Sequence, residues 1–312
     1  MCLLTAFLCD RVAFGRRYDK NPLLKYFTAE DFGLEAEQIS SGKFLNGFIY
    51  KNVKAAQNGK VIVFCHGMGP GQIAYTTEIA YFCNIGYTVV AFDVKGCNFS
   101  RGRNIKGMYE GVNTAVAAID FARSRFPEWK IYLVGHSWGG YSALCASAER
   151  SVNAVVAISA PETPSKTTMY GAVNFGLPKP LAAVLRPFWW IINLFKYGAK
   201  GNANAAKRAV KSGVPTLLVH GGDDNVVNAK NAAYALADGE NITKYYAHGK
   251  KHNPYNTVAA ENKLAELQSG LMRVKKMTEQ QKDEFFSNFD YSAATEEDGE
   301  VMNAIAEFLN KQ

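Results

Sequence analysis

The sequence predicts an α/β fold whose mostly parallel sheet carries helices on both faces. Three observations lead to this prediction. Segments with strand and helix patterns alternate from residue 35 to 160 and resume after 213, which is the order of elements in such sheets. The inner strands are unbroken apolar runs, as expected for strands buried on both faces. A strand, a sharp turn and a helix also meet at 131–150, around a Gly-x-Ser-x-Gly sequence.

The alternating part of the chain supplies the predicted strands. We expect them at 35–40, 44–50, 61–65, 87–92, 131–134, 152–159, 215–220 and 242–247. We expect helices between them at 75–84, 109–125, 141–150 and 229–237. In the second of these helices, Val112, Val116 and Ile119 give the apolar spacing of one helix face.

The alternation breaks at 161–212, which has Pro-, Gly- and Trp-rich stretches. We interpret this segment as an insertion above the carboxyl ends of the strands, where ligands bind in open α/β sheets. Three further helices are expected at 257–276, 278–288 and 296–310, and Thr278 and Gln281 form a capping box for the second. The predicted organisation is an N-terminal segment (1–34), a core (35–160 and 213–312) and a cap (161–212).

Composition narrows the class of protein. A chain of 312 residues with 48% hydrophobic and 20% charged residues is globular and long enough for a large core. Its six cysteines show no paired spacing, which predicts free thiols and a cytoplasmic location. Neither Cys-x-x-Cys nor His-Glu-x-x-His occurs, so we expect no metal site and no cofactor.

The N-terminus is open to two interpretations. Residues 2–9 are apolar but too few for a membrane span, which needs about 20, and they lack the basic leader of a signal peptide. We expect a short surface or packing segment here. The basic residues that follow, from Arg11 to Lys20, would also fit the end of a membrane anchor if upstream residues were missing.

The strongest chemical signal is the sequence Gly135-His-Ser-Trp-Gly139. Between a strand and a helix, this pattern predicts a nucleophile elbow, in which a strained turn presents the serine hydroxyl. Small residues at 135 and 139 let the strand and the helix pass close together. Ser137 is therefore the candidate nucleophile.

A serine hydroxyl is a weak nucleophile and needs a base. His66, His136 and His220 lie in turns or at a strand end, where we expect them to shape loops. Two histidines follow the last predicted strand. We prefer His252 over His248 because it lies further out in the loop and shortly before a proline that fixes the turn.

The base in turn needs a carboxylate that holds its tautomer. Asp223 and Asp224 directly follow the strand at 215–220. We take Asp224 as the acid and Asp223 as a turn residue, with Glu162 as an outside alternative. The oxyanion needs two N–H donors, which we assign to the amides of Trp138, after the nucleophile, and Met68, in the Gly-rich turn after the strand at 61–65.

These motifs resemble those of the α/β-hydrolase superfamily, most closely its serine-aminopeptidase-like and monoacylglycerol-lipase-like capped branch. The matching residues are 66–69, 93–96, 135–139, 221–224 with Val227, and His252. The resemblance covers about 35–252 and implies the α/β-hydrolase fold: an eight-stranded, mostly parallel sheet with its second strand antiparallel, helices on both faces and a helical cap. It also implies a structural Asp93. Lys95, where the family usually has Arg, and the long helical segment after His252 depart from the family.

The predicted cap, 161–212, holds eight basic residues and one acid, Glu162, whereas the rest of the chain is neutral. Its apolar run at 181–195 contains Pro187, which we expect to kink it, and is too short to span a bilayer. Two interpretations stay open: a helix packed on the sheet, or an amphipathic lid that faces lipid or an anionic surface. The candidates to bind substrate are its aromatic residues Phe188, Trp189 and Trp190.

The sequence thus predicts a serine hydrolase that cleaves a carboxylic ester with an apolar acyl chain, so the expected partner is a small ester or a lipid. Membrane-surface association through the cap or the N-terminus is a further expectation, whereas no nucleic-acid motif accompanies the charge. Two alternatives stay open. An aminopeptidase or amidase would need acidic groups to hold a substrate ammonium, and the cap has only Glu162. A non-catalytic binding protein on the same scaffold would be expected to carry a broken triad.

Overall fold

The computed structural model describes residues 2–312. Its centre is one eight-stranded sheet in the order β1-β2-β4-β3-β5-β6-β7-β8. The strands are β1 (Glu35–Ser41), β2 (Leu45–Lys51), β3 (Lys60–Cys65), β4 (Thr88–Phe92), β5 (Lys130–His136), β6 (Ala154–Ile158), β7 (Thr216–Gly221) and β8 (Ile242–Ala247). Strand β2 pairs antiparallel with β1 and β4, and all other pairs are parallel. The predicted mostly parallel sheet with an antiparallel second strand is confirmed.

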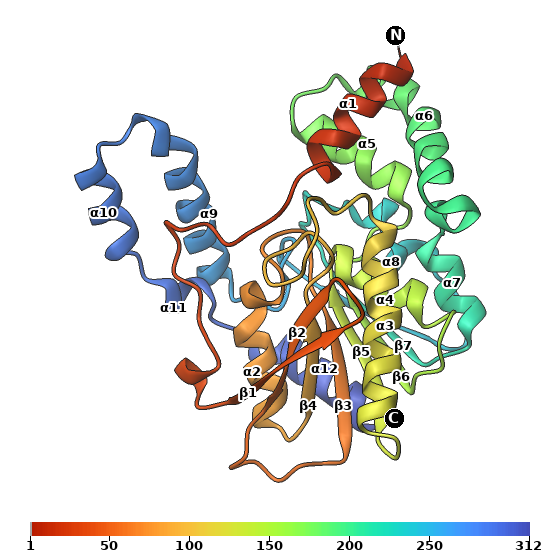
Figure 1. Cartoon of the computed structure of the whole chain (residues 1–312), viewed down its shortest axis with the longest axis vertical. Coiled ribbons are helices and arrows are strands. Elements are labelled where there is room, and N and C mark those ends of the chain that lie inside the picture. The colour runs from red at the N-terminus through yellow and green to blue at the C-terminus, as the bar shows by residue number, and fades with distance from the viewer. Residues whose placement is uncertain (1) are drawn as a thin grey trace.

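The inner strands are apolar throughout because helices cover both faces of the sheet (Figure 1). Within β3, Val61 and Val63 face one core, whereas Ile62 and Phe64 face the other. The first core is completed by α3 (Tyr109–Arg125), α4 (Trp138–Ala146), α7 (Ala205–Ser212) and α8 (Ala233–Leu236). The second is completed by α2 (Thr76–Asn84) and α12 (Gly299–Asn310). Side-chain alternation along each strand therefore stabilises both layers at once.

Three helices form a separate layer at the top of Figure 1. They are α1 (Cys2–Phe14), α5 (Pro164–Asn174) and α6 (Lys179–Tyr197). The apolar side chains that join them include Ala6, Met169 and Trp189, and the indole Nε1 of Trp189 donates a hydrogen bond to the carbonyl oxygen of Ala6 over 2.9 Å. The N-terminal segment thus packs as a helix on α5 and α6. Helix α6 continues through Pro187, and α7, the last helix of the 161–212 segment, packs on α4.

A helical arm extends from the opposite side of the molecule (Figure 1). It consists of α9 (Val258–Arg273), α10 (Glu279–Ser287) and the short α11 (Tyr291–Ala294), and it has an apolar cluster of its own. The capping box predicted at the start of α10 is confirmed, since Thr278 and Gln281 bond reciprocally.

One predicted helix, at 229–237, is wrong. The chain there forms a 3₁₀ turn (Ala229–Asn231) and the single helical turn of α8. Ala232 between them has an extended backbone and bridges to Pro161, while the amide of Ala233 donates to the carbonyl oxygen of Ala160 over 2.9 Å. This tertiary pairing outweighs the local helix propensity. Among residues 2–312, no helix is both long and apolar enough to cross a bilayer.

Candidate active site

Three side chains converge at the carboxyl edge of the sheet, each from the loop after a different strand. Ser137 follows β5, Asp224 follows β7 and His252 follows β8. The distance from His252 Nδ1 to Asp224 Oδ2 is 2.9 Å, and that from His252 Nε2 to Ser137 Oγ is 3.0 Å. Because a carboxylate only accepts, Nδ1 carries the proton and Nε2 accepts from the serine hydroxyl. The geometry can therefore draw a proton from Ser137.

The backbone at Ser137 is strained in the way that an elbow requires. Its φ of 55° and ψ of −117° are rare for a residue with a side chain. Gly135 and Gly139 make the turn sterically feasible, because a Cβ at either position would overlap neighbouring backbone atoms. The amide of Ser137 donates to the carbonyl oxygen of Ile158 over 2.8 Å, which ties the turn to β6.

Asp224 is buried, and its carboxylate accepts hydrogen bonds from its own loop and from His252. Its Oδ1 accepts from the amides of Val226 and Val227, each at 2.8 Å. Burial alone would raise the pKa of Asp224, but the hydrogen bond from His252, its positive charge when it is protonated, and the two amides hold that pKa below the usual 3.8. The carboxylate therefore stays ionised beside the imidazole.

The other candidate acids and bases lie elsewhere. Asp223 is exposed, and Glu162 forms an ion pair with Lys166. His248 is exposed, with its ring against the ring of Tyr246 at a centroid distance of 4.7 Å. The structure thus brings Asp224 and His252 to Ser137 and leaves the three alternatives out of the hydrogen-bonded chain.

Two backbone amides beside Ser137 are free to bind an anion. Within residues 2–312, the amides of Met68 and Trp138 donate no hydrogen bond to a protein acceptor. By contrast, the amide of Gly67 donates to the Tyr75 hydroxyl over 3.0 Å. Trp138 is also the first residue of α4, where the helix dipole favours negative charge.

His136, beside the serine, links three loops of the site. Its Nε2 donates to the carbonyl oxygen of His252 over 2.9 Å, and its Nδ1 accepts from the Tyr75 hydroxyl over 2.9 Å. Burial, and to a smaller extent the nearby His252, lowers the pKa of His136 to about 3. A neutral His136 thus holds the His252 loop and, through Tyr75, the amide of Gly67. The sequence signals only that His136 lies in the elbow.

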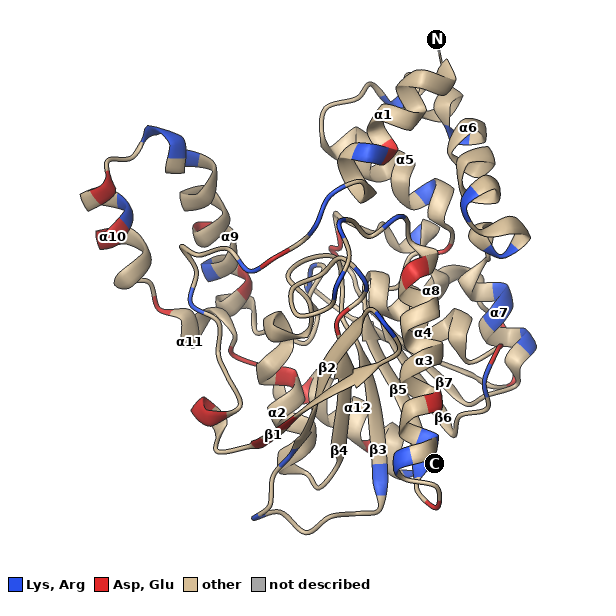
Figure 2. Ribbon diagram, viewed as in Figure 1, with Lys and Arg blue, Asp and Glu red and all other residues tan. Residues whose placement is uncertain are grey.

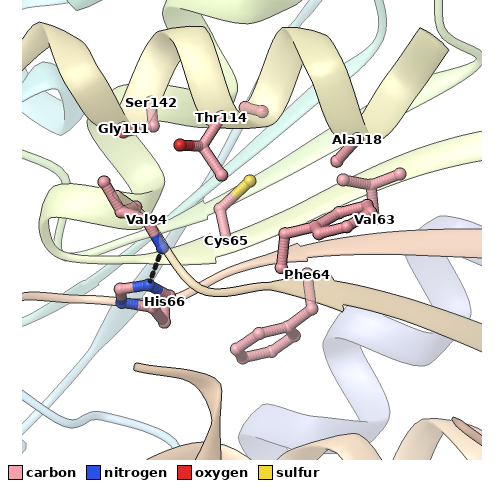
Figure 3. Close-up of a pocket in the computed structure, with 11 residues that line it drawn as sticks. Val63, Phe64, Cys65, His66, Val94, Gly111, Thr114, Ala118 and Ser142 are labelled. Atoms are coloured by element: carbon pink, nitrogen blue, oxygen red, sulfur yellow. Dashed lines mark hydrogen bonds between the residues drawn. The ribbon is translucent and has the colours of Figure 1, made fainter. Parts of the chain in front are cut away.

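His66 braces the loop that carries Met68. Its Nε2 accepts from the amide of Val94 over 2.9 Å, as Figure 3 shows, and its Nδ1 donates to the carbonyl oxygen of Gly67 over 2.7 Å. Burial lowers the pKa of His66 to about 4, so the ring stays neutral. The small space above it in Figure 3, about 10 Å³ and lined by Cys65 and Ser142 among others, is part of the core and holds no more than a water molecule.

Asp93 holds the far end of the same loop. Its Oδ1 accepts from the amide of Gln72 over 2.7 Å, and its Oδ2 accepts from the amide of Phe99 over 3.0 Å. Gly71 allows this approach, because it has a φ of 86° and a Cβ there would overlap the Asp93 carboxylate. The side chain is fully buried, so its role is to position two loops.

Comparison with known proteins supports the fold described above. A family model described as the alpha/beta hydrolase fold matches residues 60–175. The chain is similar to an esterase of Pyrococcus furiosus, with 21% identity over 83% of this chain and 98% of that one, at a TM-score of 0.61. It is also similar to an alpha-beta serine hydrolase homologue of Coxiella burnetii (18% identity, 77% and 96% covered, TM-score 0.50) and to a proline iminopeptidase of Mycobacterium smegmatis (13%, 77% and 97%, 0.50). No curated protein matches the sequence. The chain thus has the α/β-hydrolase fold.

Ser137 opens into a cavity of about 850 Å³, which is within the range of small-molecule sites. The floor of the cavity includes Met68, Trp138 and Val227. Its roof consists of α5 and, unexpectedly from the sequence, of α1. The apolar residues that α1 and the end of α5 contribute are Leu8, Cys9, Val12, Ala13, Phe14, Ala172, Phe175 and Leu177.

The prediction that Phe188, Trp189 and Trp190 bind substrate is wrong, because none of them lines this cavity. Trp189 is buried between α1 and the cap helices, and Phe188 packs on the edge of the same cluster. Trp190 points outward and is 47% exposed. The aromatic run lies on α6, whereas the helix of this segment that lies over the strand ends and lines the cavity is α5. Aromatic content therefore did not identify the residues that line the cavity.

Proposed function

We propose that this protein cleaves a carboxylic ester with an apolar acyl chain, through a Ser-His-Asp triad and an acyl-enzyme. The observation that carries the proposal is the hydrogen-bonded chain from Ser137 through His252 to Asp224. Its serine end opens into a large cavity with a mostly apolar lining. Such a chain activates an otherwise weak nucleophile.

In the first half of the proposed reaction, Ser137 Oγ forms a bond to the ester carbonyl carbon and transfers its proton to His252 Nε2. Asp224 stabilises the resulting imidazolium. The carbonyl oxygen becomes an oxyanion that accepts from the amides of Met68 and Trp138. The bond to the alcohol oxygen then breaks, and His252 returns the proton to that oxygen, so the alcohol leaves.

The second half uses water in place of the alcohol. His252 takes a proton from the water, whose oxygen attacks the acyl carbon, and the same two amides stabilise the second oxyanion. The bond to Ser137 Oγ breaks and Oγ recovers its proton from His252. The carboxylic acid leaves and the enzyme is restored, so the chemistry needs only groups that this chain supplies.

The lining of the cavity favours an ester over an aminoacyl substrate. An aminopeptidase must hold a substrate ammonium, for which a free carboxylate is the natural partner. Among the described residues that line the cavity, Glu162 is the one acid. It is already paired with Lys166 and accepts from Asn204 Nδ2 over 2.7 Å, so it has little capacity left for an ammonium.

The proposal is tested by measuring turnover of p-nitrophenyl esters of graded acyl length beside aminoacyl-anilides. We expect ester turnover that rises with acyl length and negligible anilide turnover. Ser137→Ala should abolish turnover and the labelling of the protein by a fluorophosphonate probe. Faster cleavage of anilides would assign the site to an amidase. An unmodified protein that neither turns over nor is labelled would be a binding protein.

A further inference from the structure

Helix α1 is apolar on the side that faces away from the protein. Its residues Leu3, Leu4, Phe7, Leu8 and Val12 are between 43% and 67% exposed. Their spacing places them along one stripe of the helix, which we call the α1 stripe. The opposite side is also apolar and packs on the cap. A helix that is apolar on both sides is suited to lie between protein and a second apolar phase.

The α1 stripe is continuous with the cavity that Ser137 opens into. Leu8 and Val12 belong to the stripe and also line the cavity. Phe175, at the end of α5, lines the same cavity and is 89% exposed. These three side chains therefore connect the exposed apolar surface of α1 with the lining of the cavity.

Residues 2–18, which include α1, and residues 161–212 both carry a net positive charge. Residues 2–18 and 161–212 together contain eleven basic and two acidic residues, and Figure 2 shows blue outnumbering red on α1, α5, α6 and α7. Both acids are buried in ion pairs, Asp10 with Lys196 and Glu162 with Lys166. Within residues 2–312, the basic residues of these two segments that form no ion pair are Arg11, Arg16, Lys179, Arg186, Lys207 and Lys211.

We propose that α1 docks this protein on an anionic lipid surface, with the α1 stripe at the boundary of the acyl chains and the cavity mouth turned toward the lipid. The charge argues for this occupant over a second copy of the chain, because two copies paired through α1 would bring two positive faces together. The docking itself is independent of catalysis. Only the entry of an acyl chain from the lipid to Ser137 rests on the proposed function.

The test uses the full chain carrying Ser137→Ala, so that the vesicles stay intact. Its co-sedimentation is measured with vesicles of phosphatidylcholine alone and of phosphatidylcholine with phosphatidylserine. Each basic residue near an anionic surface contributes about 1 kcal/mol, so two contacts correspond to roughly 30-fold. We expect at least about tenfold tighter binding to the anionic vesicles, weakening as salt shortens the screening length below about 10 Å.

The variants compare the α1 stripe with a matched apolar pair elsewhere. Leu4→Glu with Phe7→Glu alters two stripe residues that do not line the cavity. Val258→Glu with Met272→Glu alters two exposed apolar residues on α9, in the arm away from α1. We expect the first pair to lose at least about tenfold in vesicle affinity and the second to keep it. Both pairs, made with Ser137 intact, should hydrolyse a short soluble ester as the unmodified protein does, which shows that they fold.

Equal affinity for neutral and anionic vesicles would overturn the proposal, as would equal losses in the two pairs of variants. Absence of vesicle binding, together with a dimer in sedimentation that Leu4→Glu with Phe7→Glu dissociates, would assign the stripe to a second copy. If the unmodified protein cleaves no ester while the Ser137→Ala protein still binds anionic vesicles through the stripe, the proposed function fails and the docking stands.

Discussion

The floor and the roof of the site are held together by different forces. The floor, at the carboxyl edge of the sheet, is a network of hydrogen bonds among Ser137, Asp224, His252 and His136. The roof, α1 and α5, is joined to α6 by an apolar cluster, by the indole hydrogen bond of Trp189 and by the buried ion pair of Asp10 with Lys196. Directional bonds set atoms to within fractions of an ångström, whereas apolar packing sets only shape and volume. Activity and stability should therefore respond differently in the two halves.

The largest expected effect is in the floor. His252→Ala should lower kcat roughly 10⁴-fold or more, because the imidazole moves the proton in every step. Asp224→Asn should lower kcat by a somewhat smaller factor, since it removes the carboxylate that holds the tautomer of His252. Steady-state turnover of a short soluble ester measures both.

Two neighbours serve as matched controls for that prediction. Asp223→Asn and His248→Ala change the same residue types in the same loops, but both side chains are exposed and outside the hydrogen-bonded chain. We expect little change in turnover for either. A loss in His248→Ala as large as that in His252→Ala would contradict the assignment of the base.

The second prediction concerns the roof. Trp189→Ala empties a fully buried site between α1 and α6 and should lower the free energy of unfolding by about 3–5 kcal/mol, the usual cost for a buried tryptophan. Trp190→Ala, one residue on, removes a half-exposed ring and should cost far less. Chemical denaturation of the two variants measures the difference. Similar losses would show that the outer ring is packed as tightly as the inner one.

The same contrast explains what the sequence can predict. The floor is encoded in short motifs, since Gly135 to Gly139 specify the elbow and Asp224 and His252 lie in the loops after β7 and β8. Parallel strands bring those loop ends to one edge of the sheet. Sequence patterns therefore predict the three residues that the structure brings together, whereas the antiparallel second strand is expected only from the family resemblance.

The roof could not be predicted in the same way. Its two parts, α1 and α5, are about 150 residues apart in sequence, and apolar packing leaves no motif at either end. The aromatic run at 188–190 therefore suggested the wrong lining, and the N-terminal segment gave no sign that Leu8 and Val12 reach the cavity. The link from His136 to the His252 carbonyl was also missed, because a backbone acceptor has no sequence signature.

The third prediction concerns the loop that carries the Met68 amide, which is part of the floor but not of the triad. Gly71→Ala would place a Cβ against the Asp93 carboxylate at a φ of 86°, which should displace the loop that carries the Met68 amide. A misplacement of about 1 Å in catalytic geometry can cost about 10²-fold in rate, so we expect a fall of that order in kcat with little change in KM. Gly299→Ala, where a Cβ meets nothing within 4 Å, is the control and should be neutral. Equal kcat values for Gly71→Ala and Gly299→Ala would show that the position of this loop does not affect catalysis.

The smallest expected effect is a change in how stability depends on pH. The pKa of buried His136 lies near 3, against 6.5 for an ordinary histidine, so between these values the unfolded chain binds a proton that the folded chain does not. Stability should therefore fall as pH falls through this window, by about 1.4 kcal/mol per pH unit from this residue. Buried Glu78 and Glu297, whose pKa values burial raises to about 7 and about 9, act in the opposite direction, so the whole curve is a balance. The prediction is therefore a comparison of two proteins. Between pH 6.5 and pH 5, the free energy of unfolding of His136→Gln should fall by about 2 kcal/mol less than that of the unmodified protein. Urea denaturation at each pH measures it. Parallel pH dependences in the two proteins would mean that His136 is charged in the folded state and cannot accept from Tyr75.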